Sequence, residues 1–214
     1  MQTFNSKVKH FKKNEKGKDY VVGDVHGCFC LLRQKLYDMG FESRNDRLFS
    51  VGDLVDRGTN SFQVLEWLEY KWFHSVRGNH EQMAIDAAEG WYDPSNYISN
   101  GGEWFLNLSP VDRKIYAEAF SKLPLAIEIE TDKGLVGIVH AEVPTNNWKE
   151  IGLCNPQSIM WNRGRYMNGD TTIIKNVHKV YVGHTPIKED VIFGNTHYID
   201  TGAFYTGNLT VEEI

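Results

Sequence analysis

Short apolar runs alternate with polar, glycine-containing loops in the first half of the chain. Residues 20–22, 48–51 and 73–76 are apolar or β-prone, and they lead into GDVHG, GDLVDRG and RGNHE respectively. After each loop, apolar residues recur every three or four positions, which is the spacing of one helical face. The pattern therefore predicts three strand–loop–helix units. The predicted helices cover residues 29–39, 62–70 and 81–89, with Leu32, Leu36, Met39, Phe62, Leu65 and Leu68 facing inward.

The second half of the chain is richer in strands. Residues 125–130 and 135–139 flank the turn TDKG, which is a hairpin signal, and the second strand runs into His140. Another strand, 180–182, runs into GHTP and His184. Strands that alternate with helices predict an α/β fold, with ligands bound at the carboxyl ends of the strands. Further short strands are predicted over residues 191–193, 197–199 and 209–211.

The bulk composition is that of a soluble globular protein. The chain has 214 residues, of which 41% are hydrophobic and 24% charged, and this fits one domain. Residues 1–18 are polar and Lys-rich, so we expect a flexible arm followed by a single domain over residues 19–214. No run approaches the roughly 20 apolar residues of a membrane span. The three cysteines have no zinc-finger spacing, and we interpret them as reduced thiols of a cytoplasmic protein.

The net charge limits the partners. Lysine and arginine number 23 and acidic residues 28, a formal charge of −5. An acidic chain has no overall field that attracts nucleic acid or anionic membranes, so neither is expected as a partner. A small phosphate group is still compatible with this charge, because a local cluster of arginine and metal reverses the sign of the field within a cleft.

The polar residues at the strand ends are of the types that bind divalent cations. Carboxylate, amide oxygen and imidazole groups are all ligands of such ions. The motifs supply six such residues, which is more than one ion binds while it keeps a position open for substrate. Two ions can use all six if one carboxylate binds both of them. Asp53 is central among the motifs and is the natural candidate for that shared ligand. The first ion is expected to bind Asp24, His26 and Asp53. The second is expected to bind Asp53, Asn79, His140 and His184.

Cationic and acid–base groups accompany these ligands. Arg57, Arg77 and Arg163 are candidates to bind phosphate, because a guanidinium offers paired donors that match two phosphate oxygens. His80 is adjacent to Asn79 but is not needed as a ligand. An Asp56–His80 pair could instead hold a proton for the leaving oxygen, as a general acid does.

These motifs resemble the phosphoprotein phosphatases of the metallophosphoesterase superfamily, and most closely the bacteriophage lambda protein phosphatase type. NGGEWFLNL, IMWNR and YIDTGAFYTGNLT extend the resemblance over nearly the whole chain. It implies a two-sheet α/β sandwich flanked by helices, and a catalytic domain with two ions, usually manganese, with iron, zinc, nickel or cobalt as alternatives. Carried over by position, the six ligands above match metal ligands, His80 and Asp56 match the acid pair, and Arg57 and Arg163 match phosphate-binding residues. Asn79 is also expected to contact the phosphate.

The activity implied by the resemblance is hydrolysis of phosphoserine and phosphothreonine in proteins or peptides. Phosphotyrosine and small aryl phosphates are further substrates of such enzymes. A water that bridges the two metals would attack the phosphate in line, and His80 would protonate the leaving oxygen. The setting would be the cytosol of a bacterium or of a phage-infected host. One departure from the family pattern is HAEVP after His140, where Glu142 is expected to border the cleft and to repel acidic phosphopeptides.

Two alternatives remain open from the sequence. A symmetrical dinucleoside tetraphosphate hydrolase shares the metal motifs, but residues 91–122 are short for a nucleobase pocket. A catalytically silent, metal-dependent binding module usually lacks a ligand or the acid histidine, and none is missing here. The remaining histidines and the central tryptophans are expected to have no role at the metals. These are His10, His74, His178 and His197, with Trp67, Trp72 and Trp104 in core or lid packing.

Overall fold

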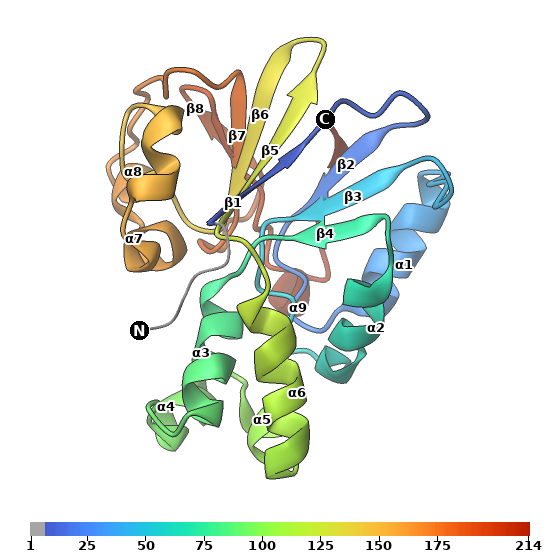
Figure 1. Ribbon diagram of the computed structural model, residues 1–214, viewed down its shortest axis with the longest axis vertical. Coiled ribbons are helices and arrows are strands. Elements are labelled where there is room, and N and C mark those ends of the chain that lie inside the picture. Colours follow the sequence, from blue (N-terminus) through green and yellow to red (C-terminus); the bar gives the residue numbers. More distant parts are fainter. Residues whose placement is uncertain (1–6) are drawn as a thin grey trace.

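The computed structural model describes residues 7–214, and these form two β-sheets with helices on their outer sides (Figure 1). The larger sheet has six strands in the order β1-β5-β6-β7-β9-β8, and the smaller has four in the order β10-β2-β3-β4. The expected two-sheet α/β architecture is therefore confirmed. The strands are β1 Val8–Phe11, β2 Asp19–Val22, β3 Arg47–Ser50, β4 Phe73–Ser75, β5 Ala126–Thr131, β6 Gly134–Val139, β7 Lys179–Val182, β8 Val191–Phe193, β9 Thr196–Tyr198 and β10 Val211–Glu213.

The helices divide into groups by the sheet they accompany. In Figure 1, α1 and α2 lie beside the four-stranded sheet, α7 and α8 lie beside the six-stranded sheet, and α3 to α6 extend below both. The α-helices are α1 Phe29–Asp38, α2 Val64–Glu69, α3 Asn79–Ala88, α4 Pro94–Ser99, α5 Glu103–Leu106, α6 Pro110–Ser121, α7 Pro156–Trp161, α8 Gly164–Met167 and α9 Ala203–Thr206. Two 3-10 helices, η1 Ser61–Gln63 and η2 Trp148–Leu153, complete the set. Within residues 7–214, no helix is both long and apolar enough to cross a membrane.

Strand direction places the polar loops together. In the smaller sheet β2, β3 and β4 are parallel, and in the larger sheet β6, β7 and β9 are parallel. The carboxyl ends of parallel strands lie at the same edge of a sheet, so the loops that follow these six strands can converge.

An apolar layer fills the space between the sheets. Val21 and Phe49 from the smaller sheet meet Ile127, Ile138 and Tyr181 from the larger one, and all five are buried. Residues that alternate with them, such as Tyr20 and Val22, pack on the helix side instead. The strands are therefore buried on both faces, which explains their nearly continuous apolar sequence.

Part of the expected N-terminal arm is a strand. Residues Val8–Phe11 form β1, which pairs in parallel with β5 at the edge of the larger sheet. Phe11 packs edge-on against Phe49 at 5.0 Å, and His10 lies 3.2 and 3.0 Å from two glutamates of β5. The prediction of a loose arm is wrong for these residues, because an edge strand needs few apolar anchors. Residues 1–6 of that arm lie outside the described residues.

The second predicted helix is shorter than expected and turned differently. It starts with the 3-10 turn η1 and continues as α2. Val64 and Trp67 form its buried face, whereas Phe62 is 57% exposed and Leu65 and Leu68 are only partly buried. The tighter 3-10 turn rotates the residues before Val64 relative to an ideal α-helix, and this moves Phe62 outward. Met39 also differs from expectation, since it lies just beyond α1 and is 37% exposed.

Candidate metal centre

The expected ligands come together where the parallel strands of both sheets end. Asp24, Asp53 and Asn79 follow strands of the smaller sheet, and His140 and His184 follow strands of the larger one. All five side chains are buried. The centre therefore lies across the junction of the two sheets, and residues far apart in the sequence build it.

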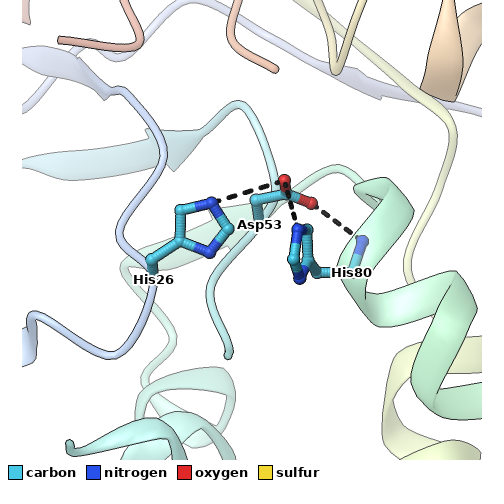
Figure 2. A group of neighbouring side chains, drawn as sticks. All are labelled: His26, Asp53 and His80. Atoms are coloured by element: carbon cyan, nitrogen blue, oxygen red, sulfur yellow. Dashed lines mark hydrogen bonds and ion pairs between the residues drawn. The ribbon is translucent and has the colours of Figure 1, made fainter. Parts of the chain in front are cut away.

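Asp53 lies in the middle of this group. Figure 2 shows its carboxylate between the imidazoles of His26 and His80, whose Nε2 atoms lie 3.7 and 3.8 Å from Oδ2. On the other side, Nε2 of His140 lies 3.3 Å from Oδ1. Two groups of close ligand atoms result, one with His26 and His80 and one with His140 and His184, and both include Asp53. This is the geometry that the predicted bridging role requires.

Glu81 holds Asp53 in an unusual backbone conformation. Asp53 has φ of 50°, in the left-handed region that non-glycine residues rarely adopt. Oε2 of Glu81 accepts the N–H groups of Asp53 and Gly78 at 3.0 and 2.8 Å, and Oε1 accepts that of Leu54 at 2.8 Å. Burial, and then the charge of Asp53, raise the pKa of Glu81 to about 7. Glu81 ends the RGNHE motif, and the sequence analysis gave it no role.

Each of three histidines predicted as ligands turns one ring nitrogen toward a backbone carbonyl. The pairs are Nδ1 of His26 with Val55 at 2.8 Å, Nδ1 of His140 with Val51 at 2.8 Å, and Nε2 of His184 with Trp161 at 3.1 Å. Because a carbonyl oxygen only accepts, the nitrogen that faces it donates. The other nitrogen of each ring then points toward the centre, as in histidines that bind metals.

Burial keeps two of these rings uncharged. It lowers the pKa of His26 well below its usual value, with His80 as the next cause, and it lowers the pKa of His184 to about 3, with His140 as the next cause. For His140, the carboxylate of Asp53 outweighs burial and raises the pKa. Neutral imidazole is the form that binds a metal, so His26 and His184 are already in that form at neutral pH.

Asp24 lies at the same centre but outside the two groups of close ligand atoms. Its two carboxylate oxygens accept the backbone N–H of His184 at 3.2 and 3.0 Å. Burial, and then the charges of Asp200 and Asp53, raise the pKa of Asp24 well above its usual value. The pKa of Asp53 is well below its usual value, because the surrounding histidines outweigh the effect of burial. Ionisation of Asp24 is therefore disfavoured by burial and by its acidic neighbours.

The two residues of the predicted acid pair are in contact, and further hydrogen bonds reach Asp56. Nδ1 of His80 lies 2.7 Å from Oδ2 of Asp56. The other oxygen of Asp56 accepts the indole N–H of Trp104 at 2.7 Å and the hydroxyl of Tyr97 at 3.3 Å. Trp104 was expected to serve only in packing. It instead fixes the carboxylate that orients His80, and NGGEWFLNL, which contains it, was the available signal.

Arg57 reaches both histidines of the first group. Its Nη1 lies 3.0 Å from Nε2 of His26, and its Nη2 lies 3.3 Å from Nε2 of His80. The guanidinium also lies 5.5 Å from the ring centre of Tyr205. The backbone of Gly101 passes so close that an added Cβ would lie 2.4 Å from the Arg57 nitrogen. The loop at residue 101 therefore needs glycine to pack against Arg57, and this packing helps to hold Arg57 at the centre.

The other two candidate arginines differ from each other. Arg163 borders the centre, since its Nη2 donates to the backbone carbonyl of His184 at 3.2 Å. Arg77 is buried, and its guanidinium donates to Gln82 and to the carbonyls of Ser121 and Leu123. The prediction that Arg77 binds phosphate is therefore wrong. Adjacency to Asn79 in sequence did not indicate the direction of its side chain.

Glu142 does not present a free carboxylate to the cleft. Only 7% of the residue is exposed, and Oε2 accepts the backbone N–H of Arg165 at 3.0 Å. We therefore no longer expect it to repel acidic phosphopeptides.

His197 lies in a separate cluster with Asp190 and Glu212, at 2.7 and 3.3 Å. These three residues also form a group of close ligand atoms. Lys179 and Tyr181 donate to the same glutamate, however, so the charge of this cluster is already balanced by protein groups.

Comparison with known proteins identifies the family. The family model for calcineurin-like phosphoesterases matches residues 20–205. The chain belongs to this family. It is 38% identical over 199 residues to serine/threonine-protein phosphatase 1 of Salmonella typhimurium, and the match covers 91% of each chain. A symmetrical bis(5'-nucleosyl)-tetraphosphatase of Hamiltonella defensa is 35% identical, but over 86 residues, which is 38% of this chain and 31% of the relative.

A solved structure shares the fold of this calcineurin-like phosphoesterase. It is described as a putative diadenosine tetraphosphatase and has a TM-score of 0.67. The match covers 97% of this chain and 93% of the solved chain at 22% sequence identity, so it supports the fold alone.

The side chains at the centre fit the divalent cations that the family implies. Oδ1 of Asn79 lies 2.8 Å from both Nε2 of His140 and Nδ1 of His184. Nε2 of His184 donates to Trp161 and the pKa of this ring is low, so its Nδ1 is an acceptor that faces the amide oxygen of Asn79, and a cation between the two makes this contact favourable. This phosphoesterase therefore presents convergent acceptors on both sides of Asp53, as two-metal sites do.

Proposed function

We propose that this phosphoesterase hydrolyses phosphoserine and phosphothreonine in proteins or peptides, with phosphotyrosine and aryl phosphates as further substrates. One observation carries the proposal: two groups of metal-ligand atoms share Asp53, and a buried Asp56–His80 pair lies beside them. The likeness to a serine/threonine-protein phosphatase along 91% of the chain supports the substrate class. We propose residues 19–214 as the catalytic domain and the cytoplasm as its compartment.

Two divalent ions, most simply manganese, would be held by the six predicted ligands. Asp24, His26 and Asp53 would hold one ion. Asp53, Asn79, His140 and His184 would hold the other. When bound, paired ions lower the pKa of water and neutralise the charge of the phosphate oxygens.

The remaining groups act on the substrate directly. Arg57 and Arg163 would bind phosphate oxygens through their paired N–H donors, and the amide of Asn79 would add a further contact. His80 would hold a proton and deliver it to the leaving serine or threonine oxygen. Asp56, fixed by Trp104 and Tyr97, keeps the His80 ring in the orientation for that transfer.

Neither alternative is favoured by a specific observation. The similarity to the symmetrical tetraphosphatase covers only 38% of this chain. The region that would supply a nucleobase pocket instead supports the acid pair, because Tyr97 and Trp104 belong to it and bond to Asp56. A silent binding module would not need a buried general acid.

The experiment is a substrate comparison with purified protein and added Mn²⁺. A phosphoserine peptide and diadenosine tetraphosphate are offered at equal concentrations, and phosphate release and nucleotide products are measured. We expect faster turnover of the peptide, and reversible loss of activity in EDTA. Faster turnover of the dinucleotide would overturn the substrate class. Activity that persists in excess EDTA, or absence of activity at every Mn²⁺ concentration, would overturn the mechanism.

A further inference from the structure

Asp200 is a buried acidic residue near the metal centre that the predicted ligand set does not include. It follows β9 by two positions, at the same sheet edge as His140 and His184, and is 2% exposed. The rule that located the other ligands, a polar residue just after a parallel strand, also applies to Asp200. The motif IDTG therefore carried a signal that the sequence analysis did not use.

The two carboxylate oxygens of Asp200 have different surroundings. Oδ1 accepts the N–H of Gly202 at 3.0 Å, which is a local turn bond. Oδ2 is buried and has no hydrogen-bond partner within residues 7–214. A buried carboxylate oxygen without a donor is costly, and the turn needs only Oδ1. An asparagine would make the same turn, so the negative charge needs another explanation.

The charges around Asp200 indicate what would offset this cost. An added Cβ at Gly23 would lie 2.3 Å from the carbonyl oxygen of Ile199 and 3.6 Å from Cα of Asp200, so the loop that carries Asp24 touches this segment directly. Burial and the charge of Asp53 raise the pKa of Asp200, although the N–H of Gly202 opposes the rise. The charge of Asp200 in turn raises the pKa of Asp24. Three buried carboxylates therefore repel one another at this end of the centre.

We propose that Asp200 is a further acidic residue of the metal centre, and that its unbonded oxygen strengthens binding of the ion held by Asp24, His26 and Asp53. The inference rests on the proposed two-metal function. A divalent cation would offset the repulsion among the three carboxylates, which His140 and Arg57 offset only in part. Asp200 is thus a positioning residue for that ion, in addition to the six predicted ligands.

The test compares two Asp-to-Asn variants by calorimetric titration with Mn²⁺. Asp200→Asn removes the charge and keeps the turn oxygen. Asp170→Asn is the control, because Asp170 accepts the N–H of Thr172, two residues on, at 2.9 Å and belongs to neither ligand group, although its second oxygen is paired with Arg165. We expect Asp200→Asn to weaken one of two Mn²⁺ sites by roughly 10–100-fold, the usual effect of an outer partner of a metal ligand. Asp170→Asn should bind both ions as the wild type does.

Thermal unfolding in excess EDTA separates this role from a purely structural one. Without metal, Asp200→Asn should be at least as stable as the wild type, because it removes a repelling charge. Its stabilisation by Mn²⁺ should be smaller. Asp200→Ser, which keeps a short acceptor at the turn, should weaken the same site if the asparagine variant does not fold. Wild-type Mn²⁺ affinity in the variants, or a lower unfolding temperature in EDTA, overturns the inference. Failure of the wild type to bind two ions overturns the proposed function itself.

Discussion

The indole Nε1 of Trp104 donates a 2.7 Å hydrogen bond to Oδ1 of Asp56, on the opposite side of the carboxylate from His80. Replacing Trp104 with phenylalanine should keep much of its edge-on packing against Phe105 and Tyr116 and remove only this bond. A hydrogen bond to a charged group contributes about 1.5–3 kcal/mol. We expect a roughly tenfold or greater loss of kcat on a phosphoserine peptide. The loss should be smaller on p-nitrophenyl phosphate, whose leaving group needs little protonation. Equal losses on both substrates would contradict a role through the acid pair.

His80→Asn tests the general acid directly. The variant removes the titratable ring, and we expect kcat on a phosphoserine peptide to fall by roughly 10²–10⁴-fold. Mn²⁺ stoichiometry, measured by elemental analysis after gel filtration, should stay at the wild-type value. Loss of one ion would instead show that His80 is a metal ligand. This outcome is tested because Nε2 of His80 lies 3.8 Å from the Asp53 carboxylate.

Arg163 and Arg77 should give opposite results, although both were expected to bind phosphate. Arg163→Ala should raise the KM for a phosphopeptide and the inhibition constant of inorganic phosphate. The stability of the fold should change little, because the guanidinium donates only to the backbone carbonyl of His184 among the described residues. Arg77→Met should leave KM unchanged and destabilise the fold by about 1.5–3 kcal/mol, because carbonyls of Ser121 and Leu123 lose a charged donor. Urea denaturation and steady-state kinetics on both variants measure the two effects.

Glu212 makes stability depend on pH in the acid range. Burial alone would raise its pKa, but His197, 3.3 Å away, and hydrogen bonds from Tyr181 and Lys179 lower it to about 2 from an ordinary 4.5. A carboxyl group with a lowered folded-state pKa adds stability above its unfolded pKa, and this stability is lost as the pH falls through the folded value. Glu212→Gln should therefore be less stable than the wild type at neutral pH.

The difference between wild type and Glu212→Gln should shrink as the pH falls from about 4.5 toward 2. Urea midpoints across this range measure it. Glu213→Gln is the control, because Glu213 is about half exposed and its ion pair with Lys18 lies at the surface. A difference between wild type and Glu212→Gln that does not change with pH would show that the glutamate contributes by packing alone.

The sequence allowed the fold and most of the centre to be predicted because the information is local there. Five of the six strands in the parallel sets are followed within a few residues by predicted ligands, and glycines in most of these loops mark the tight turns. Asp53 could be placed in the middle from the order of motifs alone. The sheet edge at which the ligands gather then follows from strand direction.

The features that were missed depend on side-chain direction or on distant contacts. Arg77 lies two residues from Asn79 but points toward the end of α6. Trp104 bonds to Asp56 from a helix 48 residues away, and β1 is a strand because β5 lies beside it. Asp200 was missed for a different reason. Its Oδ2 is buried without a hydrogen-bond donor, and a missing contact cannot be seen in the sequence. None of these contacts has a spacing that can be read along the chain.

The strand β10, close to the C-terminal end of the described residues, pairs antiparallel with β2, which lies close to their N-terminal end, and so completes the four-stranded sheet. His184 and Asp200 also come late in synthesis, well after Asp24 and Asp53 have left the ribosome. A nascent chain that stops before residue 200 would keep all six predicted ligands, but it would lack Asp200 and β10, and the edge of β2 would be open. Chains that end before β10 should therefore aggregate through the open edge of β2, even though they carry the six predicted ligands.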